Sequence, residues 1–379
     1  MSEWKKCPIG EVVTLRQGFA INAKSKHYMS KEETSLPLLR IADMKNGTKE
    51  VFVKEEIPQR FIAHPEDIIY TRTGNVGLVF RNNYGVMHNN CFSITPNDAD
   101  ELSRDFLYYA LQNKTFFDTA NALARGAAQP DLPHTSFNSI EFAYPSLFVQ
   151  ERIAYILSRY DSLIENYQKQ IKLLEEAAQR LYKEWFIDLH FPEHENTNII
   201  DGVPEGWEKK KVGEVIAKVP RSKQIPTKDY QNEGAIPIID QSRDYIAGYT
   251  DDIESRVESN EPYIVFGDHT RILKYVPFPF AKGADGTQLI MSNNLDLMPQ
   301  CLLFTSLVSV DLSNYSYARH FKYLKEEEIL VPTASIANAF SKHVAKWYAK
   351  IQLNREQIRL LTEARDRLLP KLMSGEIEI

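Results

Sequence analysis

The sequence predicts an α+β fold in which two mixed α/β domains are separated by two long antiparallel coiled-coil helices, with a pseudo-twofold internal repeat. The first observation is a long helical pattern that is written twice, over Ile164–Leu181 and again over Ile351–Leu368. The offset is 187 residues, and nine of the eighteen paired positions are identical. The same offset pairs Pro145 with Pro332, and over a hundred mostly non-helical residues precede each copy. Such a duplication predicts two copies of one architectural unit.

Length and composition indicate a folded protein of at least two domains. A chain of 379 residues exceeds one ordinary core. No apolar run approaches the roughly 18 residues of a membrane span, and the N-terminal segment lacks the apolar core of a signal peptide. The cysteines Cys7, Cys91 and Cys301 show no metal-binding spacing, so we interpret them as reduced thiols in a cytoplasmic protein.

The formal net charge of −6 argues against a protein coated in basic residues, such as a non-specific nucleic-acid binder. It does not exclude a specific binder whose Lys and Arg residues are concentrated on one face.

The first mixed domain is expected over residues 1–145. Short apolar runs bounded by Gly, Asn and Pro are typical of strands and turns, and they cover residues 37–41, 67–71, 76–80, 91–94 and 139–143. An amphipathic helix is predicted over 103–111, and a polar loop over 124–133.

A central long helix is expected over residues 146–190. Its apolar residues recur every three or four positions for about four heptads, at Ile153, Ile156, Tyr160, Leu163, Tyr167, Ile171, Leu174, Ala178, Leu181 and Trp185. This seam favours a coiled-coil partner over a globular core. About 42 helical residues would span roughly 63 Å. The polar segment 191–206 contains Pro and Gly residues and is the predicted linker.

The second half repeats this plan, with a mixed domain over residues 207–332 and a second long helix over 333–379. Trp207 is followed six residues later by Gly213 and then Glu-Val, as Trp4 is followed by Gly10. The second helix is expected to end at Ser374–Gly375, because glycine commonly terminates helices. Its apolar residues are Phe340, Val344, Trp347, Ile351, Ile358, Leu361, Ala364 and Leu368.

Each long helix exposes an apolar seam and needs a partner, and the obvious partner is the other copy. Antiparallel packing would relate the repeats by a pseudo-twofold axis and place the mixed domains at opposite ends of a rigid strut. One turn of duplex DNA measures about 34 Å. Two domains held in this way could therefore reach separate half-sites on one DNA molecule.

Three short segments, which occur in this order together with the duplication, carry a resemblance to a known family. They are residues 181–192 (LYKEWFIDLHFP), 203–207 (VPEGW) and 368–377 (LLPKLMSGEI). Over its full length the chain resembles the specificity (S) subunit of Type I restriction-modification systems.

The resemblance implies that the mixed domains are two target recognition domains, each reading one half of a split double-stranded DNA sequence. It implies that the helices set the distance between the halves and dock modification (methyltransferase) subunits. It further implies a restriction (helicase-nuclease) subunit as partner. Methyl transfer and ATP-driven cleavage would belong to these other subunits, so S-adenosylmethionine and ATP are expected there and no cofactor in this chain.

Motifs for catalysis do not emerge from the sequence. It contains no P-loop, no G-x-G-x-x-G after a strand and no H-E-x-x-H. His190 and His194 have metal-ligand spacing, but Pro192 between them breaks the helix that this spacing requires. Asp67 and the pair Asp268-His269 are interpreted as polar loop groups. We therefore predict no catalytic and no metal-binding residue.

The candidate DNA-binding residues are polar side chains in loops, because Arg reads guanine, Asn and Gln read adenine, and Lys, Ser and Thr hold phosphate. In the first domain the candidates are Arg72, Thr73, Asn75, Arg81, Asn89, Asn90, Arg125 and Gln129. In the second domain they are Arg221, Lys223, Gln241, Arg243, His269, Arg271, Tyr317 and Arg319. The acidic stretch 243–261 is expected to face mostly away from the phosphates.

Aromatic residues near the helix ends are the candidates for partner binding, because aromatics left over after helix pairing mark a partner surface. They are Phe148, Tyr155, Tyr182 and Trp185. Two alternatives stay open: a coiled-coil scaffold whose end domains bind protein, and the specificity subunit of another type of restriction system.

Overall fold

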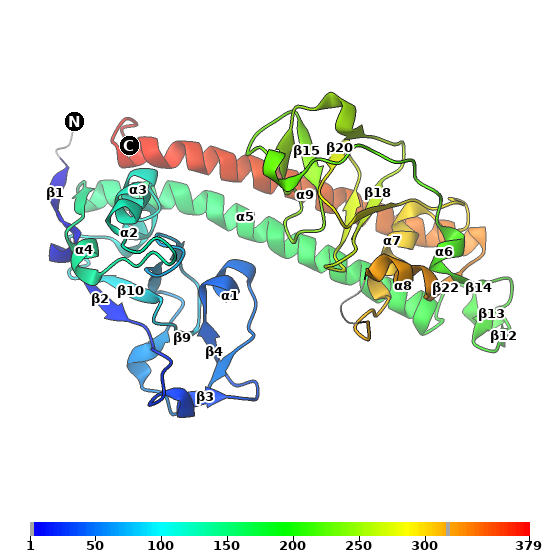
Figure 1. The fold of residues 1–379 in the computed structure, drawn as a ribbon, viewed down its shortest axis with the longest axis horizontal. Helices are drawn as coiled ribbons and strands as arrows, with labels where there is room; N and C mark the ends of the chain where they lie inside the picture. The colour runs from blue at the N-terminus through cyan, green and yellow to red at the C-terminus, as the bar shows by residue number, and fades with distance from the viewer. Residues whose placement is uncertain (1–3, 316–318) are drawn as a thin grey trace. The chain divides into compact units, whose positions relative to one another are not determined.

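The computed structural model describes residues 4–315 and 319–379 and contains two long helices, α5 (Leu147–Tyr182) and α9 (Ala334–Met373) (Figure 1). The chain divides into two compact units. One comprises Met1–Ile164 with Arg359–Ile379, and the other comprises Glu165–Ile358. Each long helix therefore contributes residues to both units.

The first unit contains two main sheets, with strand orders β2-β10-β7-β8 and β3-β5-β4-β9-β6, and a separate β1-β11 pair. Its strands are β1 (Lys5–Pro8), β2 (Val13–Gln17), β3 (Met29–Ser30), β4 (Leu36–Leu39), β5 (Phe52–Val53), β6 (Ile62–Ala63), β7 (Ile68–Thr71), β8 (Val79–Phe80), β9 (Gly85–Met87), β10 (Cys91–Pro96) and β11 (Glu141–Tyr144). Its short helices are α1 (Ile41–Asn46), α2 (Arg104–Ala110), α3 (Lys114–Leu123) and α4 (His134–Asn138).

The second unit has strand orders β19-β18-β21 and β16-β15-β20-β17, with separate β14-β22 and β12-β13 pairs. Its strands are β12 (Ile199–Ile200), β13 (Val203–Pro204), β14 (Glu208–Lys211), β15 (Ile236–Ile239), β16 (Gly248–Thr250), β17 (Arg256–Val257), β18 (Tyr263–Gly267), β19 (Leu273–Val276), β20 (Phe280–Lys282), β21 (Thr287–Ile290) and β22 (Glu328–Val331). Its short helices are α6 (Val212–Val215), α7 (Gln300–Ser309) and α8 (His320–Glu326).

The sheets confirm the internal repeat that the helices predict. The order β8-β7-β10 in the first unit matches β19-β18-β21 in the second. The order β5-β4-β9-β6 matches β16-β15-β20-β17, and in both cases the central two strands are parallel. The first strand of each mixed domain also pairs with the strand before its long helix, as β1-β11 and β14-β22.

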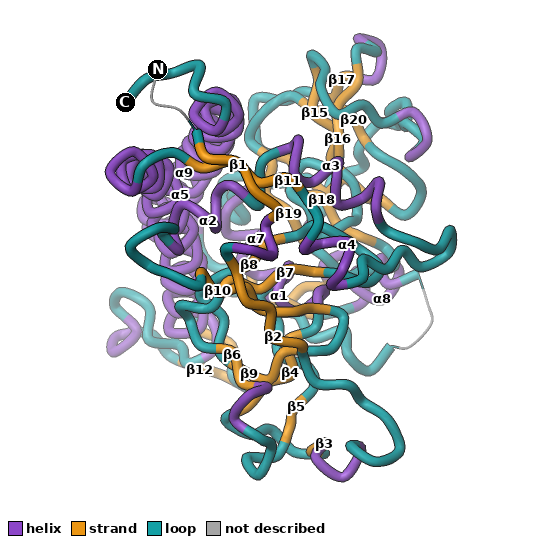
Figure 2. The backbone as a smooth tube through the Cα atoms, turned by 90° about the vertical axis from the view of Figure 1, so that its left-hand side faces the viewer, coloured by secondary structure: helices purple, strands orange, loops and turns teal. Residues whose placement is uncertain are grey.

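Apolar packing pairs the helices within each unit. In the first unit the beginning of α5 lies beside the end of α9 (Figure 2), and the shared core includes Ile153, Leu157, Leu369 and Leu372. In the second unit the end of α5 packs on the beginning of α9, and that core includes Ala178, Tyr182, Phe340, Val344 and Ile351. Both pairings are antiparallel, as predicted.

One polar pair interrupts the apolar seam of the second unit. Asn354 is fully buried, and its side-chain amide donates a hydrogen bond to Gln170 Oε1 at 3.2 Å. A buried asparagine in a helix seam favours one register over others, because a shifted register would leave its amide without a partner. This pair therefore helps to define how α5 and α9 align in this unit.

The predicted seam of α5 is wrong at one position near its middle. Leu163 was placed in the seam, but 44% of it is exposed, while Ile164 is buried. The reason is that an undistorted helix drifts relative to a strict heptad pattern, so the buried face moves to the neighbouring residue. The helix also ends earlier than residue 190: its α-helical part stops at Tyr182, and a π-helical turn, Lys183–Ile187, follows.

Several short elements of the mixed domains differ from the prediction. The strand expected over 76–80 is reduced to β8, and the residues from Ile41 start helix α1 instead of extending strand β4. Helix α3 was not predicted because only Phe116 and Ala120 are buried on it. The helix α2 was predicted correctly, and Ser103 caps it by accepting a hydrogen bond from the Phe106 amide.

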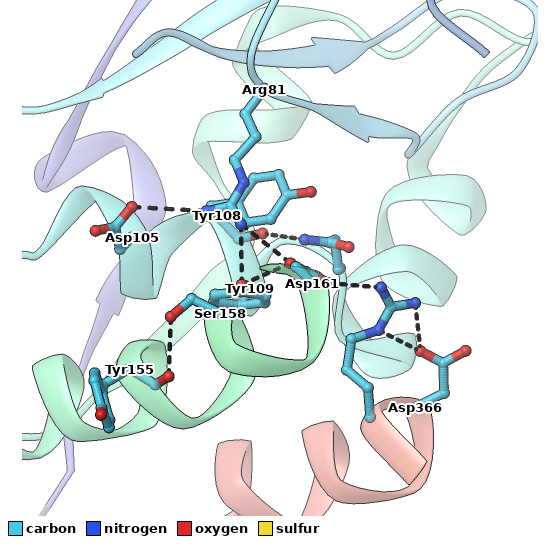
Figure 3. A network of polar contacts seen from close by, with 10 residues as sticks. Arg81, Asp105, Tyr108, Tyr109, Tyr155, Ser158, Asp161 and Asp366 are labelled. Carbon is cyan, nitrogen blue, oxygen red and sulfur yellow. Dashed lines mark hydrogen bonds and ion pairs between the residues drawn. The ribbon is translucent and has the colours of Figure 1, made fainter. Parts of the chain in front are cut away.

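A nearly buried carboxylate, Asp161 on α5, joins the first mixed domain to both long helices (Figure 3). It accepts hydrogen bonds from the Tyr109 hydroxyl at 2.6 Å and from Arg81 at 3.1 Å. Its other oxygen accepts one from Arg365 of α9 at 2.8 Å. Arg81 also lies over the Tyr108 ring, 4.1 Å from its centroid. One anion thus neutralises two guanidinium groups that are themselves mostly covered by protein.

We expect Asp161→Asn to lower the free energy of unfolding of the first unit by roughly 2–3 kcal/mol, because hydrogen bonds to charged groups contribute on this scale. Arg81 and Arg365 would keep only the largely exposed carboxylates of Asp105 and Asp366 as partners. The measurement is denaturant unfolding followed by a probe in that unit. Asp366→Asn is the matched control, because Asp366 binds the same Arg365 but is 56% exposed, and its loss should cost less than about 0.5 kcal/mol. Equal effects of the two variants would contradict this account.

Candidate nucleic-acid interface

Three loops of the first unit, distant in sequence, meet beyond the end of strand β7. Residues 72–75 follow β7, Asn89 and Asn90 precede β10, and residues 124–133 connect α3 to α4. The Arg72 amide donates to the Asn90 carbonyl at 2.8 Å, and the Gly74 amide donates to the Pro130 carbonyl at 2.8 Å. Backbone hydrogen bonds therefore join the loops into one surface.

Asp131 lies at the centre of this loop cluster. Its carboxylate accepts hydrogen bonds from the Arg72 guanidinium at 2.7 Å and from the Thr73 hydroxyl, and its backbone pairs with that of Arg125. Burial opposes ionisation of Asp131, but the hydrogen bonds from Thr73 and Arg72 outweigh it and keep the pKa of the carboxyl below its ordinary value. Gln17 accepts a further hydrogen bond from Arg72 at 3.2 Å. The Arg72 guanidinium is therefore held in one orientation.

The structure brings seven of the eight candidates of the first domain to this cluster. Asn75, Arg125 and Gln129 are exposed, whereas Arg72, Thr73, Asn89 and Asn90 are partly buried. Gly74 and Gly126 have φ values of +83° and +98°, which other residues rarely adopt, so the loop shapes depend on glycine. The result is a surface of guanidinium, amide and hydroxyl groups, the types that contact base edges and phosphates.

Arg81 is the eighth candidate, and its placement in the interface is wrong. Its guanidinium is engaged by Asp161, Tyr109 and Tyr108 against the long helix, and only 20% of its side chain is exposed. Arg81 therefore fastens the domain to α5.

The second unit has a corresponding cluster, which is organised around Gln241. The Gln241 side-chain amide donates to the Asp285 carbonyl at 2.8 Å and accepts from the His269 amide at 3.1 Å. The Thr270 hydroxyl donates to the Gln241 carbonyl at 2.7 Å. Both ends of the Gln241 amide are thus used inside the domain, where they join three loops.

Exposed polar residues lie on the loops that Gln241 joins. His269 and Arg271 lie on the turn between β18 and β19, and Arg243 lies on the loop after β15. Arg271 has a φ of +63° and donates from Nη1 to the Leu312 carbonyl at 2.9 Å, so its guanidinium is oriented by the protein.

The remaining candidates of the second domain do not join this cluster in the described residues. Lys223 forms ion pairs with Asp252 at 2.7 Å and Glu254 at 3.3 Å, so it neutralises part of the acidic stretch. Arg221 is exposed and lines a separate hollow with Lys282 and Gln288. Arg319 is exposed at the start of α8, and Tyr317 lies outside the described residues.

The acidic residues considered for catalysis have structural partners. Asp67 pairs with Arg16 at 2.6 Å. Asp268 is buried and accepts the Phe321 amide at 2.8 Å. Across residues 4–315 and 319–379, no group of three His, Cys, Asp or Glu side chains could hold a metal ion. Nor does any helix in these ranges have the length and apolar character needed to cross a membrane.

The four aromatic residues proposed for partner binding divide into two pairs. Phe148 and Tyr155 are each 65% exposed on α5, and they line a shallow pocket with Arg152. Tyr182 and Trp185 are buried, so their assignment to a partner surface is wrong.

The burial of Tyr182 and Trp185 follows from their contacts with the other long helix. The centroid of the Phe340 ring lies 6.4 Å from that of Tyr182 and 5.8 Å from that of Trp185. They are core residues of the second unit.

Sequence reasoning missed the residues that orient Arg72 in the interface, Asp131 and Gln17, and the residue that binds Arg81, Asp161. In the polar loop 124–133, Arg and Gln residues were selected as candidates. Asp131 was not selected, because DNA repels a negatively charged side chain. Only the pairing of Asp131 with Arg72, 59 positions away, reveals its role.

Comparisons with known proteins identify relatives of this chain. A family model described as "Type I restriction modification DNA specificity domain" matches residues 1–176. The MjaIX Type I restriction enzyme specificity subunit of Methanocaldococcus jannaschii is 30% identical over 314 residues, which cover 76% of this chain and 72% of that protein. The HindI specificity subunit of Haemophilus influenzae is 21% identical over the full length of both chains.

A solved structure shares the fold. The S subunit of a Type I restriction-modification system from M. genitalium covers 98% of this chain and 96% of its own, with a TM-score of 0.60 at 17% identity. The family is shown by the 30% identity to the Methanocaldococcus jannaschii subunit, which covers 76% of this chain, and the family model over residues 1–176 agrees with it. The chain belongs to the specificity subunits of Type I restriction-modification systems.

Proposed function

We propose that this chain is a non-catalytic subunit that reads a split double-stranded DNA sequence with two recognition domains, residues 1–145 and 207–332. The observation that carries the proposal is that the two loop clusters lie at corresponding places in the repeat. Arg72 and Thr73 follow strand β7, and His269, Thr270 and Arg271 follow the matching strand β18. Two equivalent sites in one chain fit a target with two halves.

The side chains in both clusters support base reading rather than general attraction to DNA. With a net charge of −6 the chain has little long-range pull on phosphates. Guanidinium groups held by neighbours, as Arg72 is by Asp131 and Gln17, lose less conformational entropy on binding. Arginine in such a fixed orientation suits bidentate contact with guanine.

We assign the spacing of the half-sites to the helical regions, residues 146–190 and 333–379, with residues 191–206 as the linker. The antiparallel pairing of α5 and α9 within each unit supports this role, because a paired helix is stiffer than a single one. We assign methyl transfer with S-adenosylmethionine, and ATP-driven cleavage, to modification and restriction subunits that assemble on this chain.

The first prediction from the proposed function concerns sequence-specific binding. Alone, the chain should bind DNA weakly, and with its methyltransferase partner it should select one split sequence from a random duplex library. The measurement is sequencing of the DNA retained by the complex. Enrichment of two short blocks at a fixed distance is the expected result.

One result would contradict the proposal. Absence of any sequence preference with the partner present would overturn the reading role and favour a scaffold whose end domains bind protein.

The second prediction concerns partner docking at Phe148 and Tyr155. Replacing both with serine should weaken binding of the methyltransferase subunit by at least about tenfold, because exposed aromatic residues often dominate interface energies. The measurement is a titration of the partner by light scattering or calorimetry. Leu173→Ser is the control, since Leu173 is 64% exposed elsewhere on the same helix; a loss of the same size there would argue against a specific site.

The third prediction concerns spacing. Four residues inserted into each helix beside the Gln170–Asn354 pair add about 6 Å of helix, which corresponds to about two base pairs at roughly 3.4 Å each. The selected DNA should keep both half-sites and gain about two base pairs between them. A change in the sequence of either half-site would contradict the spacing role.

A further inference from the structure

A lysine lies in the interior of the second unit, beneath one of the proposed reading loops. Lys274 belongs to strand β19, and only 4% of its side chain is exposed. Buried lysines are rare and require compensation by acceptors. Lys274 finds two such acceptors at opposite ends of one loop.

The loop is residues 240–244, which follows strand β15 and carries Gln241 and Arg243. The Lys274 ammonium donates a hydrogen bond to the Asp244 carbonyl at 2.5 Å and lies 3.8 Å from the Asp240 carboxylate. The two ends of the loop therefore meet at a single positive charge.

Asp240 has further contacts that keep its carboxylate in place. It accepts hydrogen bonds from the Ser242 amide at 2.8 Å and from the Tyr230 hydroxyl at 3.2 Å. Asp240 thus links the folded turn of the loop to Lys274. Loss of the ammonium charge would remove the attraction that draws Asp240 towards the strand.

A cavity of about 160 Å³ adjoins Lys274 and leaves room for the loop to shift. The charged and titratable groups around it are Glu175 from α5, Arg355 from α9, Arg243 and Tyr245 from the loop region, and Tyr275 and Tyr348. Most of these groups are bound to one another. The Arg355 guanidinium forms an ion pair with Glu175 at 3.0 Å and lies 3.9 Å from the centroid of Tyr245.

We propose that Lys274 is a positioning residue for DNA reading by the second domain: its ammonium group closes the 240–244 loop so that Gln241 and Arg243 keep their places in the interface. The proposal rests on the proposed function and adds to it a residue that never touches DNA.

The acid–base behaviour of Lys274 supplies a distinctive test. Burial lowers the pKa of its ammonium to about 8, although Asp240 and Asp244 oppose this shift; Arg355 lowers the pKa further. The charge that holds the loop is therefore lost as the pH rises through about 8.

Raising the pH through this range is expected to weaken DNA reading, but its effect on the stability contribution of Lys274 has the opposite sign. Between about pH 8 and the ordinary lysine pKa near 10.4, the unfolded chain binds more protons at this residue than the folded chain does. The contribution of Lys274 to the free energy of unfolding therefore rises with pH in this window. Weaker DNA discrimination at pH 9 could therefore not be explained by unfolding of the second unit through deprotonation of Lys274.

The experiment uses the assembled complex with the DNA selected above and with two altered DNAs, each with one half-site scrambled. Discrimination at a half-site is the Kd for the DNA scrambled there divided by the Kd for the intact target. For the wild-type protein, discrimination at one half-site should fall about tenfold or more between pH 7 and pH 9, which is the scale of one base contact. Discrimination at the other half-site should stay within about twofold and serves as the internal control.

Lys274→Met keeps the length of the side chain without its charge. At pH 7 it should show the reduced discrimination that the wild type shows at pH 9, and it should show no further change with pH. Lys209→Met is the matched control, because Lys209 is 56% exposed on strand β14 and pairs with Glu328 there; it should behave like the wild type.

The outcomes separate the proposal from the function on which it rests. A complex that selects no sequence refutes the reading role itself. A complex that selects a split target, but whose two half-sites respond equally to pH, overturns the role of Lys274. The wild-type pH profile decides this even if Lys274→Met fails to fold.

Discussion

The structure depends on one constraint: the apolar faces of two long helices have to be removed from water. An isolated helix of this kind is unstable without tertiary contacts, because packing supplies most helical stability in proteins. The chain meets the constraint internally, since each half of α5 packs against a half of α9 within its own unit. The mixed domains are then attached to the helices by contacts such as Asp161 with Arg81 and Tyr109.

The duplicated helix made the architecture predictable from sequence. An apolar residue at every third or fourth position defines a helix and its buried face, and the repeat identifies the partner. Leu163 marks the limit of this reasoning, because a drift of one residue along the helix cannot be seen in a pattern of spacings. The short helix α3 was missed although its two buried residues, Phe116 and Ala120, lie one helical turn apart, because two such residues are a weak signal.

The candidate interface was predictable by residue type and only partly by position. Loop Arg, Asn and Gln residues were recognisable, and most of those in the first domain meet around Asp131. Arg81 and Lys223 have the same chemistry, but acidic partners far away in sequence engage them in structural roles. Whether an arginine faces solvent or a buried carboxylate is decided by tertiary contacts.

The contacts of Asp161 limit whether one mixed domain could replace the other in this chain. At the offset of 187 residues, the position of Asp161 is taken in the second repeat by Tyr348. Tyr348 packs against the rings of Tyr275 and Phe304, with centroids 4.8 Å and 5.2 Å away. At this one position of the repeat, a carboxylate joins the first half to its helix and an aromatic ring joins the second. A first domain transplanted to the second position would bury Arg81 without the carboxylate of Asp161, so the halves of this chain repeat one plan but are not interchangeable.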